Sequence, residues 1–178
     1  MQRVIYTKFV VRNNIREMDG MGGSVPRQLY LLLLLDGDPV KQRLRLQKLM
    51  FLLQKEIVER KGLQASTEEY DFTAYNYGPF SDELIDDIEF LKDLELIDVI
   101  KENDVELYKI TEKGRKFLAD FLQKAPSSSK KLLQTVKREI ENLKKKWNKE
   151  PLKKLLRYVY EYYPEYTEKS LIRHLLSG

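Results

Sequence analysis

The side chains best spaced for chemistry are two pairs of carboxylates, Asp82/Asp86 and Glu83/Asp87, each separated by four positions in a helical pattern. Residues four apart lie on one face of a helix, so each pair is suited to a hard cation such as Mg²⁺, and less well to acid–base chemistry. No further ligand set converges on them in the sequence. We therefore expect neither a metal ion nor a catalytic residue here.

Other chemistry-bearing residue types are scarce. The 178 residues include no cysteine and a single histidine, His174. These counts exclude a disulfide scaffold, thiol catalysis and a multi-histidine metal site, and they argue against a Ser/His relay. The longest apolar run, residues 29–35, is too short to span a bilayer. We expect a non-enzymatic, cytoplasmic protein without a cofactor or a membrane partner.

Charge is strongly segregated along the chain. Residues 1–61 carry 12 basic and 6 acidic side chains, residues 62–108 carry 2 and 14, and residues 109–178 carry 18 and 8, for a formal net charge of +4. An acidic centre between basic flanks predicts separate positive and negative faces, each able to steer a partner of opposite sign. The alternative is that the charges pair within the molecule and serve solubility.

The basic flanks contain the candidate nucleic-acid-binding residues. Phosphate contacts need cations, and an aromatic ring beside them adds stacking. The candidates are Lys41, Arg43, Arg45, Lys48, Lys113, Arg115, Lys144, Lys145 and Lys146. The last three form the densest cluster, beside Trp147. The alternative is a set of solvated helix faces, on which Gln47 and Lys48 face solvent and Trp147 packs in the core.

The acidic centre contains the candidate residues for a basic protein partner. These are Asp82, Glu83, Asp86, Asp87 and Glu89, with Tyr75 and Tyr77 from the preceding segment. Residues 82–98 carry eight carboxylates and one lysine, which disfavours insertion of this helix into a DNA groove. The alternative is a solvated face matched by Lys and Arg of the preceding helix, with the tyrosine rings in the core.

The periodicity of apolar residues predicts a mainly helical chain of α+β class. Helices are expected at residues 27–35, 39–61, 81–95, 111–124, 130–147, 151–163 and 167–176, an extended segment at 70–77 that Gly78-Pro79 ends, and a β-hairpin at 96–100 and 106–110. Ser81 and Thr111 are the expected N-caps. Residues 1–25 are expected to form a flexible tail or edge strand, residues 26–125 a winged helix-turn-helix domain, and residues 126–178 a helical extension.

Two surfaces of the extension suggest contacts with other molecules. The helix expected at 130–147 has one narrow apolar seam, which allows either a homodimer or packing on the body of the domain. On the next helix, Tyr162 and Tyr166 are expected to be exposed, as a contact with a partner or a second copy.

Two sequence motifs resemble known families. The segment YKITEKGR (residues 108–115) resembles the end of the wing in many winged-helix regulators. The segments RLQKLMFLLQ (residues 45–54) and FTAYNYGPFSDEL (residues 72–84) resemble the YwgA-like family and, more distantly, the Panacea (SocA-like) antitoxin domain. The second resemblance covers about residues 27–124, and the Panacea group implies neutralisation of a toxin by protein contact.

Two functions are therefore expected. The first is a winged-helix regulator, similar to transcriptional regulators, that binds nucleic acid through its basic flanks. The alternative is a protein-binding module that resembles an antitoxin and uses the acidic helix.

Overall fold

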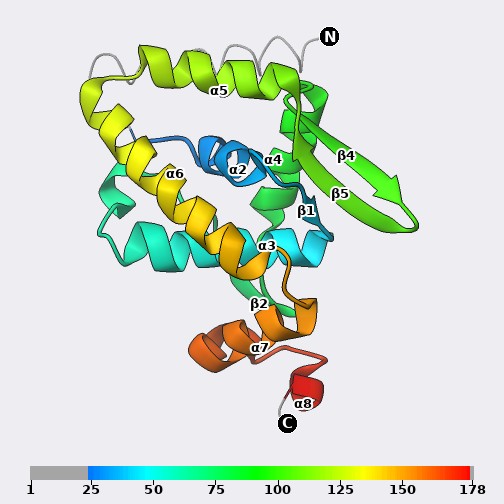
Figure 1. The fold of residues 1–178 in the computed structure, drawn as a ribbon. Helices are drawn as coiled ribbons and strands as arrows, with labels where there is room; N and C mark the ends of the chain where they lie inside the picture. Colours follow the sequence, from blue (N-terminus) through cyan, green and yellow to red (C-terminus); the bar gives the residue numbers. More distant parts are fainter. Residues whose placement is uncertain (1–23, 177–178) are drawn as a thin grey trace.

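The computed structural model describes residues 24–176 as a mainly helical fold with a small antiparallel sheet (Figure 1). The α-helices are α2 (Arg27–Leu35), α3 (Arg43–Leu52), α4 (Asp82–Asp93), α5 (Glu112–Lys124), α6 (Ser127–Trp147), α7 (Leu152–Tyr162) and α8 (Arg173–Leu176). A π-helix, η1 (Leu53–Glu59), continues α3, and short 3₁₀ segments occupy η2 (Gln64–Ser66) and η3 (Pro164–Thr167). The predicted α+β class is confirmed at this level.

A three-stranded sheet in the order β1-β5-β4 carries the predicted β-hairpin. It consists of β1 (Val40–Lys41), β4 (Ile97–Glu102) and β5 (Val105–Ile110), all antiparallel. Asn103 and Asp104 make the turn with φ of 49° and 62°, the left-handed pair that a tight hairpin requires. The hairpin projects from one end of the molecule (Figure 1).

The helix predicted to begin at Pro39 starts later, at Arg43. Val40 pairs with Tyr108 in the sheet, and the Gln42 N–H donates to Glu106 O over 2.8 Å, so this segment is extended. The extended segment ends before Gly78-Pro79, as predicted, but the return strand that follows was not predicted. Gly78–Phe80 forms β3, which pairs with β2 (Thr73–Tyr75) as a second hairpin.

Two predicted N-caps have different outcomes. Thr111 Oγ1 accepts a hydrogen bond from the Gly114 N–H over 2.9 Å, as expected. A Cβ on Gly114 would lie 2.1 Å from Leu96 O, so only glycine lets α5 approach the base of the hairpin. Ser81 occupies the N-cap position of α4, but its hydroxyl makes no capping bond.

One hydrophobic core includes side chains from Val25 through α7. The seam of α6 faces this core, with its residues at most 6% exposed: Leu133, Val136, Ile140, Leu143 and Trp147. Of the two alternatives for the seam, packing on the body is therefore the observed one. The predicted boundary after residue 125 falls between α5 and α6, and residues on both sides of it contribute to the same core.

The ends of the chain differ from the prediction in part. The predicted tail lies mostly outside the described residues; within them, Val25 forms a parallel bridge with Thr67. The helix predicted at 167–176 is limited to α8, which has four residues.

Candidate interaction surfaces

Three of the predicted nucleic-acid-binding cations are buried and serve the fold. Lys48 is 1% exposed, Arg45 is 7% exposed and Lys144 is 9% exposed. Each donates to main-chain carbonyl groups of segments far away in the sequence. These three side chains are therefore not available as a phosphate-binding surface.

Lys48 and Gln47 are buried beneath the β2–β3 hairpin and form hydrogen bonds with its main chain and with Ser81. The interpretation that these two residues face solvent is therefore wrong. Lys48 Nζ donates to Pro79 O over 2.7 Å, and burial lowers its pKa from 10.5 to about 7. The Gln47 carboxamide bonds both the N–H and the carbonyl of Ser81, each over 3.0 Å. Helix α3 is buried along nearly all its length, so its polar residues meet main chain instead of water.

Arg45 and Lys144 attach α6 to the first helices. Arg45 donates to Trp147 O over 2.6 Å and to Glu150 O over 2.8 Å, at the junction of α6 and α7. Lys144 donates to Asp36 O over 2.9 Å and to Asp38 O over 2.6 Å, in the turn after α2. Burial lowers the pKa of both groups.

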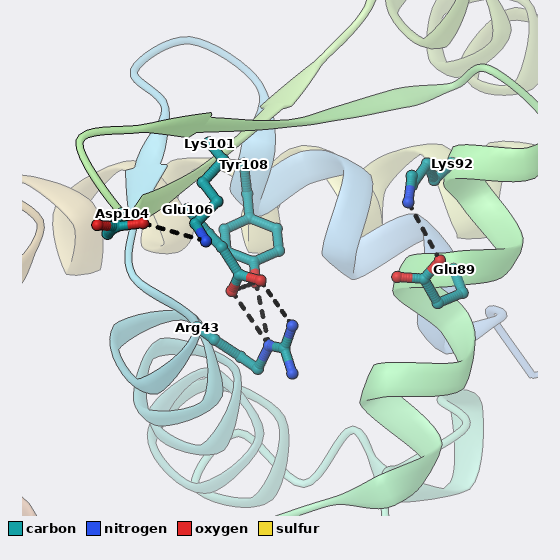
Figure 2. Close-up of polar contacts among 7 residues, drawn as sticks. All are labelled: Arg43, Glu89, Lys92, Lys101, Asp104, Glu106 and Tyr108. Atoms are coloured by element: carbon teal, nitrogen blue, oxygen red, sulfur yellow. Dashed lines mark hydrogen bonds and ion pairs between the residues drawn. The ribbon is translucent and has the colours of Figure 1, made fainter.

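Three further basic candidates are engaged in ion pairs. Figure 2 shows the Arg43 guanidinium turned toward the Glu106 carboxylate, at 2.6 Å, and the Tyr108 hydroxyl, at 3.3 Å. Lys113 pairs with Glu95 over 2.6 Å. Arg115 contacts Glu112 over 3.3 Å and Asp36 over 3.8 Å. Their positive charge is largely matched within the chain.

Lys41, Lys145 and Lys146 are the remaining members of the predicted basic set, and all three are exposed. Lys41 lines a groove of about 610 Å³ between the sheet and the α6–α7 junction, together with Asp38, Arg45 and Lys149. A neighbouring hollow of about 390 Å³, which shares Asp38 and Lys149, includes Lys145. Ion pairs of Lys149 with Asp38 (3.3 Å) and Lys137 with Asp36 (3.4 Å) reduce the positive potential along both hollows.

Two acidic candidates on α4 point toward α2 and are paired there. The Asp87 carboxylate, in a residue 7% exposed, accepts from Arg27 Nε and from Gln28 Nε2, each over 3.0 Å. Arg27 also contacts Glu83 over 2.8 Å, and Glu83 accepts from the Asp71 N–H. The cation that pairs with these carboxylates is therefore Arg27 of α2, and not a residue of α3, the helix from which the sequence predicted it. Arg27 and Gln28 were not among the predicted site residues, because their role depends on the approach of α4.

The remaining acidic candidates form an exposed row on the outer side of α4. We define the acidic row as Asp82, Asp86, Glu89 and Asp93, which are all exposed. Their spacing of four, three and four positions places them along one line of the helix. Glu89 contacts Lys92 over 3.3 Å (Figure 2), whereas Asp82 and Asp86 have no cation within 4 Å in the described part of the chain.

Tyr75 and Tyr77 on the β2–β3 hairpin are 50% and 45% exposed. The Tyr75 ring lies 5.2 Å from the ring of Phe80, two residues before the acidic row begins. Leu171, 62% exposed, donates its N–H to Asn76 O at the tip of the hairpin. An exposed aromatic and aliphatic patch therefore adjoins the N-terminal end of α4. The alternative that the Tyr75 and Tyr77 rings lie in the core is therefore wrong, whereas Tyr70 and Phe72, earlier in the same segment, are buried.

Comparisons with known proteins do not identify the chain: neither a family model nor a curated sequence matches it. Between residues 24 and 176, no cluster of three or more potential metal ligands is found. Over the same span, every helix is too short or too polar to cross a bilayer.

Proposed function

We propose that this protein is a non-enzymatic binding module, built on a winged-helix scaffold, that captures a basic protein partner on the acidic row of α4. The order of elements supports the scaffold. Helix α2, strand β1, helix α3, helix α4 and the β4–β5 hairpin follow the winged helix-turn-helix order, and the first strand lies beside the last, as in β1-β5-β4. The β2–β3 hairpin is an insertion before α4.

The charge of α4 carries the proposal. In a winged-helix regulator this third helix usually enters the major groove of DNA. Here it would bring the acidic row toward phosphate groups, and Lys92 is the only cation on the helix. The negative carboxylates and the negative phosphate groups would repel each other, which opposes DNA binding. A cationic protein surface would be attracted by the same carboxylates.

The tyrosines beside α4 supply the aromatic anchors that a row of carboxylates lacks. Exposed charges contribute little affinity by themselves, and most binding energy at protein interfaces comes from a few aromatic or Arg anchors. Tyr75 and Tyr77 are half exposed and adjacent to the row. The resemblance to the Panacea antitoxin domain supports the same type of function, because it includes the segment from Phe72 to Leu84.

Affinity capture with the full-length chain tests this proposal. The bait with D82N/D86N/E89Q/D93N is compared with a bait carrying E161Q/E165Q/E168Q, which neutralises exposed carboxylates on and after α7. We expect the wild type and the second variant to retain one basic protein that the first variant loses. The captured protein is then purified and titrated against each variant at low and high salt.

A purified partner should bind the acidic-row variant at least tenfold more weakly, and the difference should shrink at high salt. The variant Y75A/Y77A should also weaken binding, with little change in salt dependence. Equal affinity for the wild type and the acidic-row variant would overturn the proposal. So would a captured protein with an acidic surface.

A further inference from the structure

Three aromatic rings form a continuous series where α6 meets α7. The centroids of Trp147 and Tyr158 are 4.7 Å apart, and those of Tyr158 and Tyr162 are 4.5 Å apart, with the rings tilted by 46° and 35°. Exposure rises along the series, from 4% at Trp147 to 60% at Tyr162. The outermost ring therefore presents an aromatic surface to solvent with two rings packed behind it.

The inner part of this aromatic series is held in place. Tyr158 and Tyr162 are four residues apart on α7, so they share one face of the helix. The Tyr158 hydroxyl donates to Glu56 on η1 over 2.6 Å, and Arg45 holds the α6–α7 junction by two carbonyl groups. A surface that is already ordered loses little entropy when a ligand packs on it.

A cation accompanies the rings. The Lys146 ammonium lies 4.9 Å from the Trp147 centroid and 4.5 Å from the Tyr158 centroid, within cation–π range, while the residue remains exposed. Residues 127–157 carry 11 basic and 3 acidic side chains. Lys145, Lys149 and Lys153 are exposed in the same segment. Lys146 and its exposed neighbours therefore place positive charge beside Trp147, although Lys149 is paired with Asp38 and the exposed Glu161 adjoins Tyr162.

We infer that this surface binds single-stranded nucleic acid, with an unpaired base stacked on Tyr162 and phosphate groups beside Lys146 and its basic neighbours. Aromatic rings combined with cations are typical of sequence-tolerant single-strand binding. In a duplex the base faces are already stacked, so Tyr162 would add nothing to the binding of a duplex.

Fluorescence anisotropy with the full-length chain tests this inference. The probes are a labelled twelve-nucleotide oligothymidine, the matching oligouridine and a twelve-base-pair duplex, each titrated at several salt concentrations. We expect both single strands to bind more tightly than the duplex. We also expect Y162A to weaken single-strand binding about tenfold and Y162F to retain it. K146Q should weaken binding and reduce the slope of log affinity against log salt concentration by somewhat less than one.

Y75A is the matched control, since Tyr75 is also a half-exposed tyrosine but lies beside the acidic row. It should leave single-strand affinity unchanged, as should D82N/D86N/E89Q/D93N. Circular dichroism establishes that each variant is folded. Equal affinity for single strand and duplex, an unchanged affinity in Y162A, or no binding at low salt would each overturn the inference without bearing on the protein-binding function of α4.

Discussion

The Gln47 side chain forms hydrogen bonds with both the N–H and the carbonyl of Ser81. The carboxamide thereby makes the two main-chain contacts that a neighbouring strand would otherwise make. Gln54, seven residues later, binds the N–H and carbonyl of Tyr70 in the same way, at 2.8 and 3.0 Å. These two carboxamides bracket the segment that carries the β2–β3 hairpin. The position of the exposed tyrosines and the start of α4 therefore depends on glutamines buried below them.

Replacing Gln47 with leucine should destabilise the protein by about 2–4 kcal/mol, because two buried main-chain groups lose their partners. Urea unfolding followed by circular dichroism measures the change. Gln134→Leu, on the exposed side of α6, is the control and should change stability by less than about 0.5 kcal/mol. Similar losses in both variants would contradict the role assigned to Gln47.

Lys48 should make the stability depend on pH above neutrality. Its pKa is about 7 in the folded protein and near 10.5 when exposed. Between these values the unfolded chain binds a proton that the folded protein does not. The free energy of unfolding should therefore rise with pH in this window, by up to about 1.4 kcal/mol per unit. Below pH 7 both states are protonated and this dependence ends.

Urea unfolding at pH 7.0, 8.0 and 9.0 measures this effect in the wild type and in Lys48→Met. The variant should show a clearly smaller slope. Burial also lowers the pKa of Lys144, so some slope remains in both proteins. Tyr163, whose pKa burial raises to about 12, acts in the opposite direction only above about pH 10. Parallel slopes in the two proteins would refute the assignment to Lys48.

The helices with a clear apolar stripe, α4 to α7, could be predicted from the sequence, as could the β4–β5 hairpin. The errors occur where a distant segment decides the local structure. Val40 is extended because Tyr108 pairs with it, and no local signal at Pro39 opposes a helix start. Gly78-Pro79 continues in a strand because a positive φ of 85° at Gly78 makes the turn itself.

The exposed candidates were easier to predict than the buried ones. Asp82, Asp86 and Glu89 lie on the outer side of an amphipathic helix, which the pattern indicates directly. Lys48 lies on a helix buried on almost every side, where polar residues meet main-chain groups. The acceptor of its hydrogen bond, Pro79 O, is a main-chain carbonyl, which no sequence motif marks as an acceptor.

Arg27 should contribute far more stability than the exposed cation of α4. Arg27→Met leaves the buried Asp87 carboxylate with Gln28 alone, which should cost about 3 kcal/mol. Lys92→Met breaks the exposed pair with Glu89 and should cost less than about 1 kcal/mol. Thermal unfolding distinguishes the two outcomes. The double variant R27M/D87L should recover part of the loss, because it removes the unpaired buried charge as well.

Arg45 should control the order of α7 independently of overall stability. Arg45→Met leaves Trp147 O and Glu150 O without their buried donor, and the C-terminal end of α6 has no other side chain that holds both carbonyl groups among the described residues. Hydrogen exchange should therefore accelerate in residues 148–162 and stay unchanged in α4. Lys41→Met, in the same groove but exposed, is the control and should change neither segment. If exchange in α4 and α7 accelerated equally, Arg45 would stabilise the whole fold and would not specifically anchor the aromatic series at the α6–α7 junction.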